Sequence, residues 1–187
     1  MDAFSYLSVL LSIILGLAIT QVLQGYRALI LARGRVKLAP TALIWSAVIL
    51  VSAVQAWWAS FGLRDHLEWS FATFAVILLQ MILLYMQSAI VLPDPSTTAE
   101  AIDLDAHHEA HRRAFFGFLL GTIAASLLKD VMLDGSLPEP RNLVGQLIAA
   151  GLAVVGMVIA DRRVQLAIAL LAAAGLAIYI GLLFAEL

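Results

Sequence analysis

The sequence predicts an all-α polytopic membrane protein with six transmembrane helices, and three observations predict it. Hydrophobic residues make up 63% of the 187-residue chain and charged residues only 13%, whereas soluble domains have about 45–50% and about 25%. Long stretches carry no charge, and the basic residues between them fall mainly on alternate connections. Lipid accepts only helices or closed barrels, and these stretches lack the alternation of barrel strands.

Uncharged stretches define the predicted helices, because a helix needs about 20 apolar residues to cross the hydrocarbon core. Five stretches meet this length, but the fourth span is weaker, since only residues 114–128 are uncharged before Lys129 and Asp130. We predict a single transmembrane domain over 1–187, with a cytoplasmic loop at 94–112. The predicted spans are about 4–28, 40–63, 69–92, 113–133, 141–160 and 164–185.

Basic residues in short connections set the orientation, since they are enriched on the cytoplasmic side of membranes. With both termini outside, the inner connections hold eight of the 11 Lys and Arg residues. These eight are Arg27, Arg33, Arg35, Lys37, Arg112, Arg113, Arg162 and Arg163. The dominance of alanine, leucine and arginine indicates a bacterial source. We therefore predict a multi-pass protein of the bacterial inner (plasma) membrane with both termini periplasmic.

Net charge and cysteine content exclude several functions. The formal net charge is −2 and there is no cysteine, so we expect neither nucleic-acid binding nor disulfide or thiol chemistry. The sequence shows no phosphate loop, no Rossmann glycine pattern and no arrangement typical of an intramembrane protease. We expect no cofactor, and the expected partners are membrane lipids, with a homo-oligomer or a larger membrane complex left open.

Four polar residues in or near the spans are candidates for a solute path. Gln21 and Gln24 share a helix face near the cytoplasmic end of the first span, and Lys129 with Asp130 interrupts the fourth span near its outer end. Polar groups in hydrocarbon are costly and usually face the protein interior or a water-filled cavity. The alternative is structural: the glutamines emerge among headgroups, and Lys129 snorkels to the surface.

Two histidines in the predicted cytoplasmic loop are candidate metal ligands. His107 and His111 lie one helical turn apart, with Asp103 and Glu109 nearby, a spacing that suits a shared divalent metal. The order differs from the His-Glu-x-x-His pattern of zinc hydrolases. The alternative is a solvated helix that leads into the fourth span.

Small residues recur at four-residue spacing, which lets helices approach closely in lipid. The positions expected to pack helices are Gly16, Gly117, Gly121, Gly145, Ala149, Ala173, Ala177 and Gly181. Leu15-Gly16 in the first span also matches Leu120-Gly121 in the fourth. Such matches are consistent with two inverted three-helix halves, and chance agreement among common apolar residues is the alternative.

Several short segments carry a resemblance to other proteins. They are Tyr6-Leu7-Ser8-Val9, Ser12-Ile13-Ile14-Leu15-Gly16-Leu17, the Trp57-Trp58 pair, and the helix end from Tyr85 to Pro93-Asp94. With these segments the chain resembles a group of uncharacterised small bacterial polytopic membrane proteins. The resemblance covers most of the chain and implies no activity.

Three classes of function follow from the sequence. The preferred one is a transporter- or channel-like protein for a small solute or ion, with its path near Gln21, Gln24, Lys129 and Asp130. The second is a non-catalytic membrane subunit, scaffold or sensor that acts through an oligomer or partner. A metal- or lipid-acting enzyme centred on the histidines is the least favoured. The few charges in the spans argue against a proton pump, which usually needs several buried carboxylates.

Reporter fusions test the predicted orientation. Alkaline phosphatase joined at Asp2 or at Leu187 should be active, and green fluorescent protein at the same positions should be dark, because both termini are expected in the periplasm. The same reporters inserted after Ala101, in the predicted cytoplasmic loop, should give the opposite pattern. A cytoplasmic signal from either terminus would contradict the six-span topology or its orientation.

Overall fold

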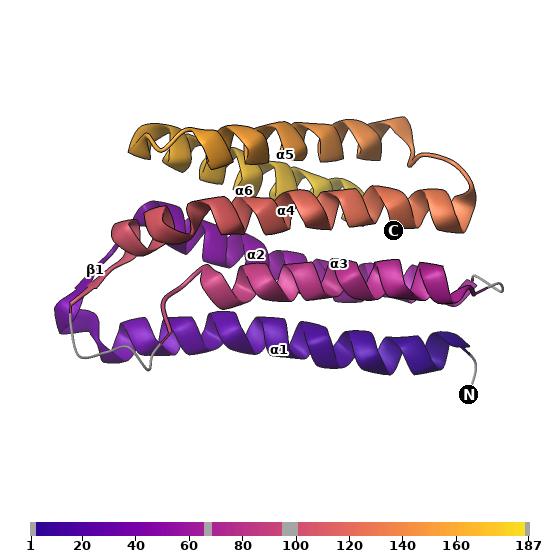
Figure 1. The fold of residues 1–187 in the computed structure, drawn as a ribbon, viewed down its shortest axis with the longest axis horizontal. Coiled ribbons are helices and arrows are strands. Elements are labelled where there is room, and N and C mark those ends of the chain that lie inside the picture. The colour runs from indigo at the N-terminus through magenta and orange to yellow at the C-terminus, as the bar shows by residue number, and fades with distance from the viewer. Residues whose placement is uncertain (1–2, 66–68, 95–100, 186–187) are drawn as a thin grey trace.

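The computed structural model describes residues 3–65, 69–94 and 101–185, and these form a bundle of long helices (Figure 1). The long helices are α1 (Ala3–Leu31), α2 (Pro40–Ser60), α3 (Phe71–Ile90), α4 (Leu104–Asp134), α5 (Pro140–Val158) and α6 (Arg162–Ala185). The short elements are η1 (Arg33–Arg35), β1 (Val36–Lys37), η2 (Phe61–Asp65) and β2 (Ile102–Asp103). Six described helices are long and apolar enough to cross a membrane. The predicted all-α architecture with six helices of this kind is therefore confirmed.

Local chemistry sets where several helices begin and end. Pro40 and Pro140 are the first residues of α2 and α5, where a missing backbone N–H costs little. Asp103 caps α4, because its carboxylate accepts hydrogen bonds from the backbone N–H groups of Asp105 and Ala106 at 2.9 and 3.1 Å. Gly135 ends α4 with a φ of 66°, a left-handed conformation that glycine adopts without a steric penalty.

The helices lie in two layers (Figure 1). Helices α1, α3, α4 and α5 lie side by side in that order, and α2 and α6 lie behind them. Consecutive long helices run in opposite directions, so the α1–α2 connection and the beginnings of α4 and α6 share one end of the bundle. The most extensive packing joins α3 to α4. Among the described residues, α1 and α6 do not pack closely against each other. The two inverted halves stay a prediction.

Helix α4 begins earlier than the predicted span. Its 31 residues extend about 46 Å at about 1.5 Å per residue, well beyond a hydrocarbon core of about 30 Å. The part of the predicted loop 94–112 from Leu104 onward is therefore helix, and α4 is longer than a single span requires. Residues 95–100 of that loop lie outside the described part of the chain.

A two-residue strand pair, which the sequence analysis did not predict, ties two connections together. Strand β1 pairs in parallel with β2, with Val36 opposite Ile102. The Lys37 ammonium also lies 2.7 Å from an Asp103 carboxylate oxygen. These contacts fix the α1–α2 connection to the start of α4.

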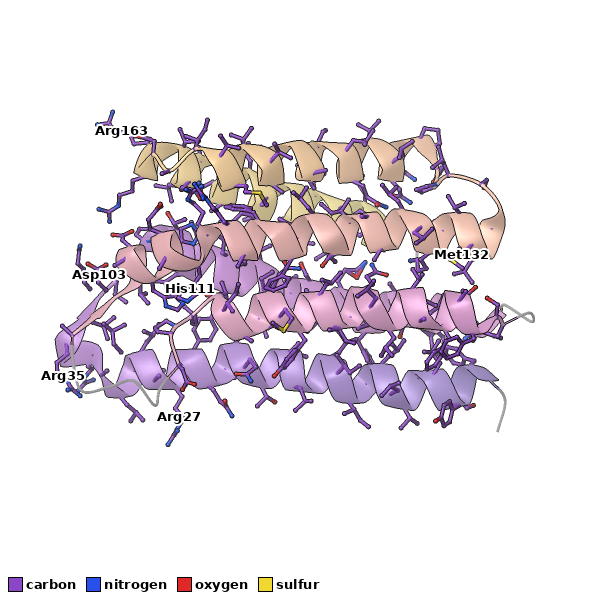
Figure 2. All side chains as sticks on the ribbon, in the orientation of Figure 1. Arg27, Arg35, Asp103, His111, Met132 and Arg163 are labelled. Atoms are coloured by element: carbon purple, nitrogen blue, oxygen red, sulfur yellow. The ribbon has the colours of Figure 1, made fainter. Side chains whose placement is uncertain are left out.

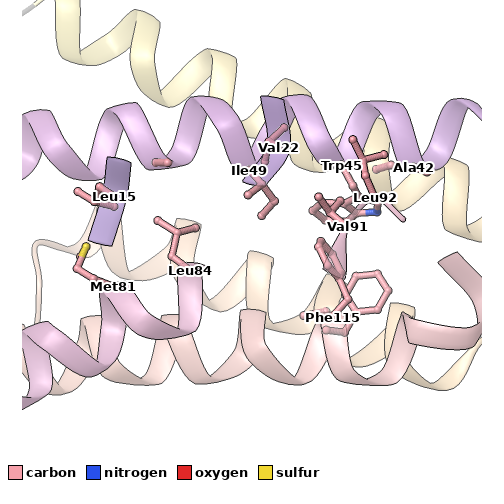
Figure 3. Packing of buried hydrophobic residues seen from close by; sticks show 14 of the residues in the cluster. Leu15, Val22, Ala42, Trp45, Ile49, Met81, Leu84, Val91, Leu92 and Phe115 are labelled. Atoms are coloured by element: carbon pink, nitrogen blue, oxygen red, sulfur yellow. The ribbon is translucent and has the colours of Figure 1, made fainter. Parts of the chain in front are cut away.

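An aromatic cluster fills the interior near the basic end of the bundle. Trp45 of α2 meets Phe115 and Phe116 of α4 edge to face, with ring centroids 5.0 and 5.5 Å apart, and all three side chains are buried. Figure 3 shows Trp45 and Phe115 within the packed interior. Helix α5 packs against this cluster at Gly156, where an added Cβ atom would clash with the Phe116 ring. Gly156 therefore sets how closely α5 approaches α4.

The small residues predicted to pack helices fall into two groups. Gly121 and Gly117 line the contacts of α4, since a Cβ there would lie 3.2 Å from Leu83 of α3 and 3.6 Å from Met157 of α5, respectively. A Cβ at Gly16, Gly145 or Gly181 would meet nothing within 4 Å. The alanines Ala149 and Ala173 are half-buried, and Ala177 is exposed. A packing role for this second group stays a prediction that needs another chain.

Replacing Gly156 by alanine tests the close approach of α5 to α4. We expect Gly156→Ala to lower the free energy of unfolding by about 1–3 kcal/mol, because the added methyl group forces the locked Phe116 ring to move. Thermal unfolding in detergent micelles measures the change. The matched control is Gly145→Ala in the same helix, which should be neutral or slightly stabilising, since alanine favours helix over glycine. Equal losses in both variants would contradict the proposed packing.

Candidate functional site

The first turns of α4 cap the C-terminal ends of both neighbouring helices. A helix leaves its last four carbonyl groups without partners inside the helix. The His107 Nε2 atom lies 3.0 Å from the carbonyl oxygen of Ile90, the last residue of α3. Arg112 Nη1 donates to the carbonyl oxygens of Gly156, at 2.9 Å, and Met157 in the last turn of α5. One short segment of α4 thus supplies hydrogen-bond partners to carbonyl groups at the ends of both α3 and α5.

Arg112 is buried, with only 4% of its surface exposed. Its Nε atom lies 3.2 Å from a carboxylate oxygen of Glu109, so the buried cation has a partner. A positive charge is also favoured at a helix C-terminus by the helix dipole. Arg112 therefore joins α4 to α5 by charge as well as by hydrogen bonds.

Gln165 of α6 completes this capping cluster, which consists of His107, His108, Arg112 and Gln165. Its Nε2 atom donates to the carbonyl oxygens of Gly156 at 2.8 Å and Ile159 at 2.6 Å. Its Oε1 atom must then accept a hydrogen bond from His108 Nε2, 3.1 Å away. The cluster holds the beginnings of α4 and α6 to the end of α5.

Burial favours the neutral form of both capping histidines. Burial lowers the pKa of His107 and of His108 below the usual value of 6.5, because an imidazolium loses hydration in the protein interior. A neutral His108 that donates from Nε2 keeps a free lone pair on Nδ1. Beside it lies a pocket of about 240 Å³ between α2, α4 and α6, bordered by the Asp105–Arg162 ion pair.

The two predicted metal ligands lie together but are partly engaged. The rings of His107 and His111 have centroids 4.4 Å apart. His107 Nε2 contacts the Ile90 carbonyl, and His111 Nδ1 lies 2.9 Å from the His107 carbonyl oxygen, so each ring keeps one nitrogen. Within residues 3–65, 69–94 and 101–185, no group of three or more His, Cys, Asp or Glu side chains is placed to hold a metal. A metal bound by this pair stays a prediction.

The predicted path residues of α1 line one pocket. Gln21 and Gln24 border a cavity of about 150 Å³ between α1 and the end of α3. Gln21 Nε2 donates to the Tyr85 hydroxyl group of α3 at 3.3 Å. The helices are close here, because a Cβ at Gly25 would lie 2.7 Å from Leu92.

The other predicted pair lies at the opposite end of the bundle. Lys129 Nζ lies 3.1 Å from Asp130 Oδ1, and their side chains are 25% and 19% exposed. In Figure 2, Met132 marks this end, whereas Arg27 marks the end near Gln24. The four candidates therefore form two pairs rather than one site.

Two glutamines of α3 that the sequence analysis did not single out have unpaired buried oxygens. Gln87 is fully buried, and its Nε2 atom donates to Thr122 Oγ1 of α4 at 2.8 Å. Among the described residues, the Oε1 atoms of Gln87 and Gln80 are buried without a hydrogen-bond partner. The available signal was their spacing, because residues seven apart lie on one helix face.

The Gln87–Thr122 contact joins α3 to α4, and we extend it by helical spacing to a polar line along this interface, made of Gln80, Gln87, Thr122 and Lys129. Gln80 lies seven residues before Gln87, and Lys129 lies seven residues after Thr122. Because α3 and α4 are antiparallel, this spacing predicts that Gln80 lies opposite Lys129, two helical turns from the Gln87–Thr122 contact. Thr122 lies nine residues beyond Arg113, about 14 Å along the helix. If Arg113 marks the predicted cytoplasmic boundary, the polar line runs from the middle of the span towards the end at Met132.

Comparison of the chain with protein-family models, curated proteins and solved structures finds no match. The resemblance to small bacterial membrane proteins therefore stays a prediction. Any functional assignment has to rest on the capping cluster, the two pockets and the polar line.

Removing Arg112 tests the capping cluster. We expect Arg112→Gln to lower the free energy of unfolding by about 1.5–3 kcal/mol, because the shorter amide leaves carbonyl groups of α5 without a charged donor. Thermal or denaturant unfolding in micelles measures the loss. The adjacent Arg113 is exposed, so Arg113→Gln should change stability by less than about 0.5 kcal/mol. An Arg112→Gln variant as stable as the wild type would show that the cap is dispensable.

Proposed function

We propose that this chain is a small transporter- or channel-like membrane protein that passes a small solute or ion along the α3–α4 polar line. The observation that carries the proposal is the pair of buried amide oxygens on Gln80 and Gln87 that lack a partner within the described chain. Such a group costs about 1–3 kcal/mol when buried unsatisfied, so its presence calls for a visiting partner such as water or a solute.

The surroundings of the polar line support this proposal. The exposed faces of the helices carry large apolar side chains, such as Ile148 and Leu170, which are 59% and 53% exposed and suit contact with lipid. Apolar or small side chains would suffice to pack α3 against α4 in such surroundings. The contact instead includes the Gln87 amide and the Thr122 hydroxyl group. The proposed line extends from there to Gln80 and to the Lys129–Asp130 pair.

The proposed setting is the bacterial inner membrane with both termini periplasmic. Supporting it, the residues labelled Arg27, Arg35 and Arg163 gather at one end of the bundle (Figure 2), as expected for a cytoplasmic side. The proposed path needs neither a cofactor nor two inverted halves. The pocket of Gln21 and Gln24 lies on the α1 side of α3 and would serve as a separate inner vestibule.

A second candidate function is a non-catalytic subunit, scaffold or sensor. It is favoured by the open space at Gly16, Gly145 and Gly181, since small residues on a helix surface let another helix approach in lipid. In that case the polar line would be a structural contact filled by water. Solute flux separates the two candidates, because a subunit or scaffold passes no solute alone.

Flux through purified protein in liposomes tests the proposed path. After osmotic shock with glycerol, urea, ammonium chloride or potassium chloride, at least one of these solutes should enter vesicles that contain the protein faster than protein-free vesicles. Gln80→Met and Gln87→Met keep side-chain length and remove the oxygen. Each should lower that flux about tenfold, the equivalent of one hydrogen bond of about 1.4 kcal/mol.

The control for this experiment is Gln146→Met. Gln146 also has a buried Oε1 atom without a partner among the described residues, but it belongs to α5, outside the polar line. Its replacement should leave flux unchanged. Gln80→Met and Gln146→Met should be at least as stable as the wild type, because an unsatisfied group is removed, whereas Gln87→Met also loses the hydrogen bond to Thr122, so the unfolding of each variant is measured beside its flux. Wild-type flux no faster than that of empty vesicles would end the transport proposal.

A further inference from the structure

The hydrogen bonds around Gln87 fix which end of its amide is open. Thr122 donates its hydroxyl proton to the Phe118 carbonyl oxygen at 2.9 Å, so its oxygen is left to accept. The group that donates to it at 2.8 Å must be Gln87 Nε2, which also lies 3.5 Å from the Leu83 carbonyl oxygen. Both neighbours of Nε2 are acceptors, so Oε1 is the unpaired end. At Gln87 the polar line therefore offers an acceptor, not a donor, to a visiting solute.

The charges at the outer end point the same way. Lys129 is the one cation of the polar line, and its ammonium group lies 3.1 Å from the Asp130 carboxylate. An anion on the line would meet amide oxygens and a lysine that already has a partner. An ammonium group, in contrast, is already accommodated at this end of the line, because the ammonium group of Lys129 lies there beside the Asp130 carboxylate.

The number of oxygens argues against a bare metal ion. Calcium takes about six to eight oxygen ligands, and magnesium needs near-octahedral coordination, whereas each level of the line offers one unpaired amide oxygen. Gln80 and Gln87 are seven residues apart, about 10.5 Å along the helix, so one small solute contacts one at a time. Weak binding at successive positions suits conduction, because a solute must leave as easily as it enters.

We infer that the polar line selects small cations that donate hydrogen bonds, of which ammonium and methylammonium are the simplest, and that it rejects anions. This inference rests on the proposed transport function and adds its substrate class. Gln87 and Gln80 act as the specificity-determining residues through their Oε1 atoms. Asp130 acts indirectly, because it neutralises Lys129 next to the line.

Currents from proteoliposomes on a solid-supported membrane test the inference, since only the charged form of an amine carries current. Methylammonium should give a current at least tenfold larger than tetramethylammonium, which has the same charge and no N–H donor. Nitrate should give none. Gln87→Met and Gln80→Met should each reduce the methylammonium current about tenfold, and Gln146→Met should not. Asp130→Asn should also reduce it, because Lys129 is then unneutralised.

The possible failures are distinguishable. Equal methylammonium and tetramethylammonium currents, a nitrate current, or flux of neutral urea or glycerol without any current would overturn the substrate class but leave a transport function standing. No flux of any probe would remove both. Thermal unfolding of each variant identifies a current lost through misfolding. Methylammonium currents that persist in a folded Gln80→Met, Gln87→Met double variant would also overturn the inference.

Discussion

The end of a helix that is buried in a bundle needs partners for its last carbonyl groups, and this constraint organises the basic end of the molecule. Arg112 and Gln165 are buried there, so side chains rather than water supply the donors. The first turns of α4 supply them to α3 through His107 and to α5 through Arg112. Because one segment serves both neighbours, the positions of α3, α4 and α5 depend on one another. Gln165 extends the same arrangement to α6.

Helix α4 makes a tightly packed apolar contact on the face towards α5 and a partly polar contact on the face towards α3. On the α5 side, Gly156 admits the Phe116 ring, so the contact is apolar and tight. On the α3 side, Gly121 admits Leu83, but Gln87 and Thr122 meet next to it. Under the proposed transport function, the tight contact with α5 and the capping cluster would hold α4 in place while a solute passes along its α3 side.

The sequence was sufficient to predict the number and approximate extent of the helices, because uncharged runs and prolines act locally. It also indicated that Lys129 and Asp130 interrupt the fourth span, and they do lie within α4 as an ion pair. It did not indicate which helices are neighbours, because apolar faces in lipid look alike whichever helix covers them. Arg112 therefore read as an orientation signal rather than as a buried cap. Gln80 and Gln87 were passed over because uncharged residues do not interrupt a span.

The capping cluster also implies an order in which the molecule is completed during synthesis. The carbonyl group of Ile90 finds its donor only 17 residues later, at His107, so the end of α3 is satisfied as soon as α4 emerges. Helix α5 differs, because Arg112 is made before it and Gln165 after it. A nascent chain that has released α5 but not α6 thus has one of its two caps. Helix α5 therefore has both of its caps only after α6 has been made.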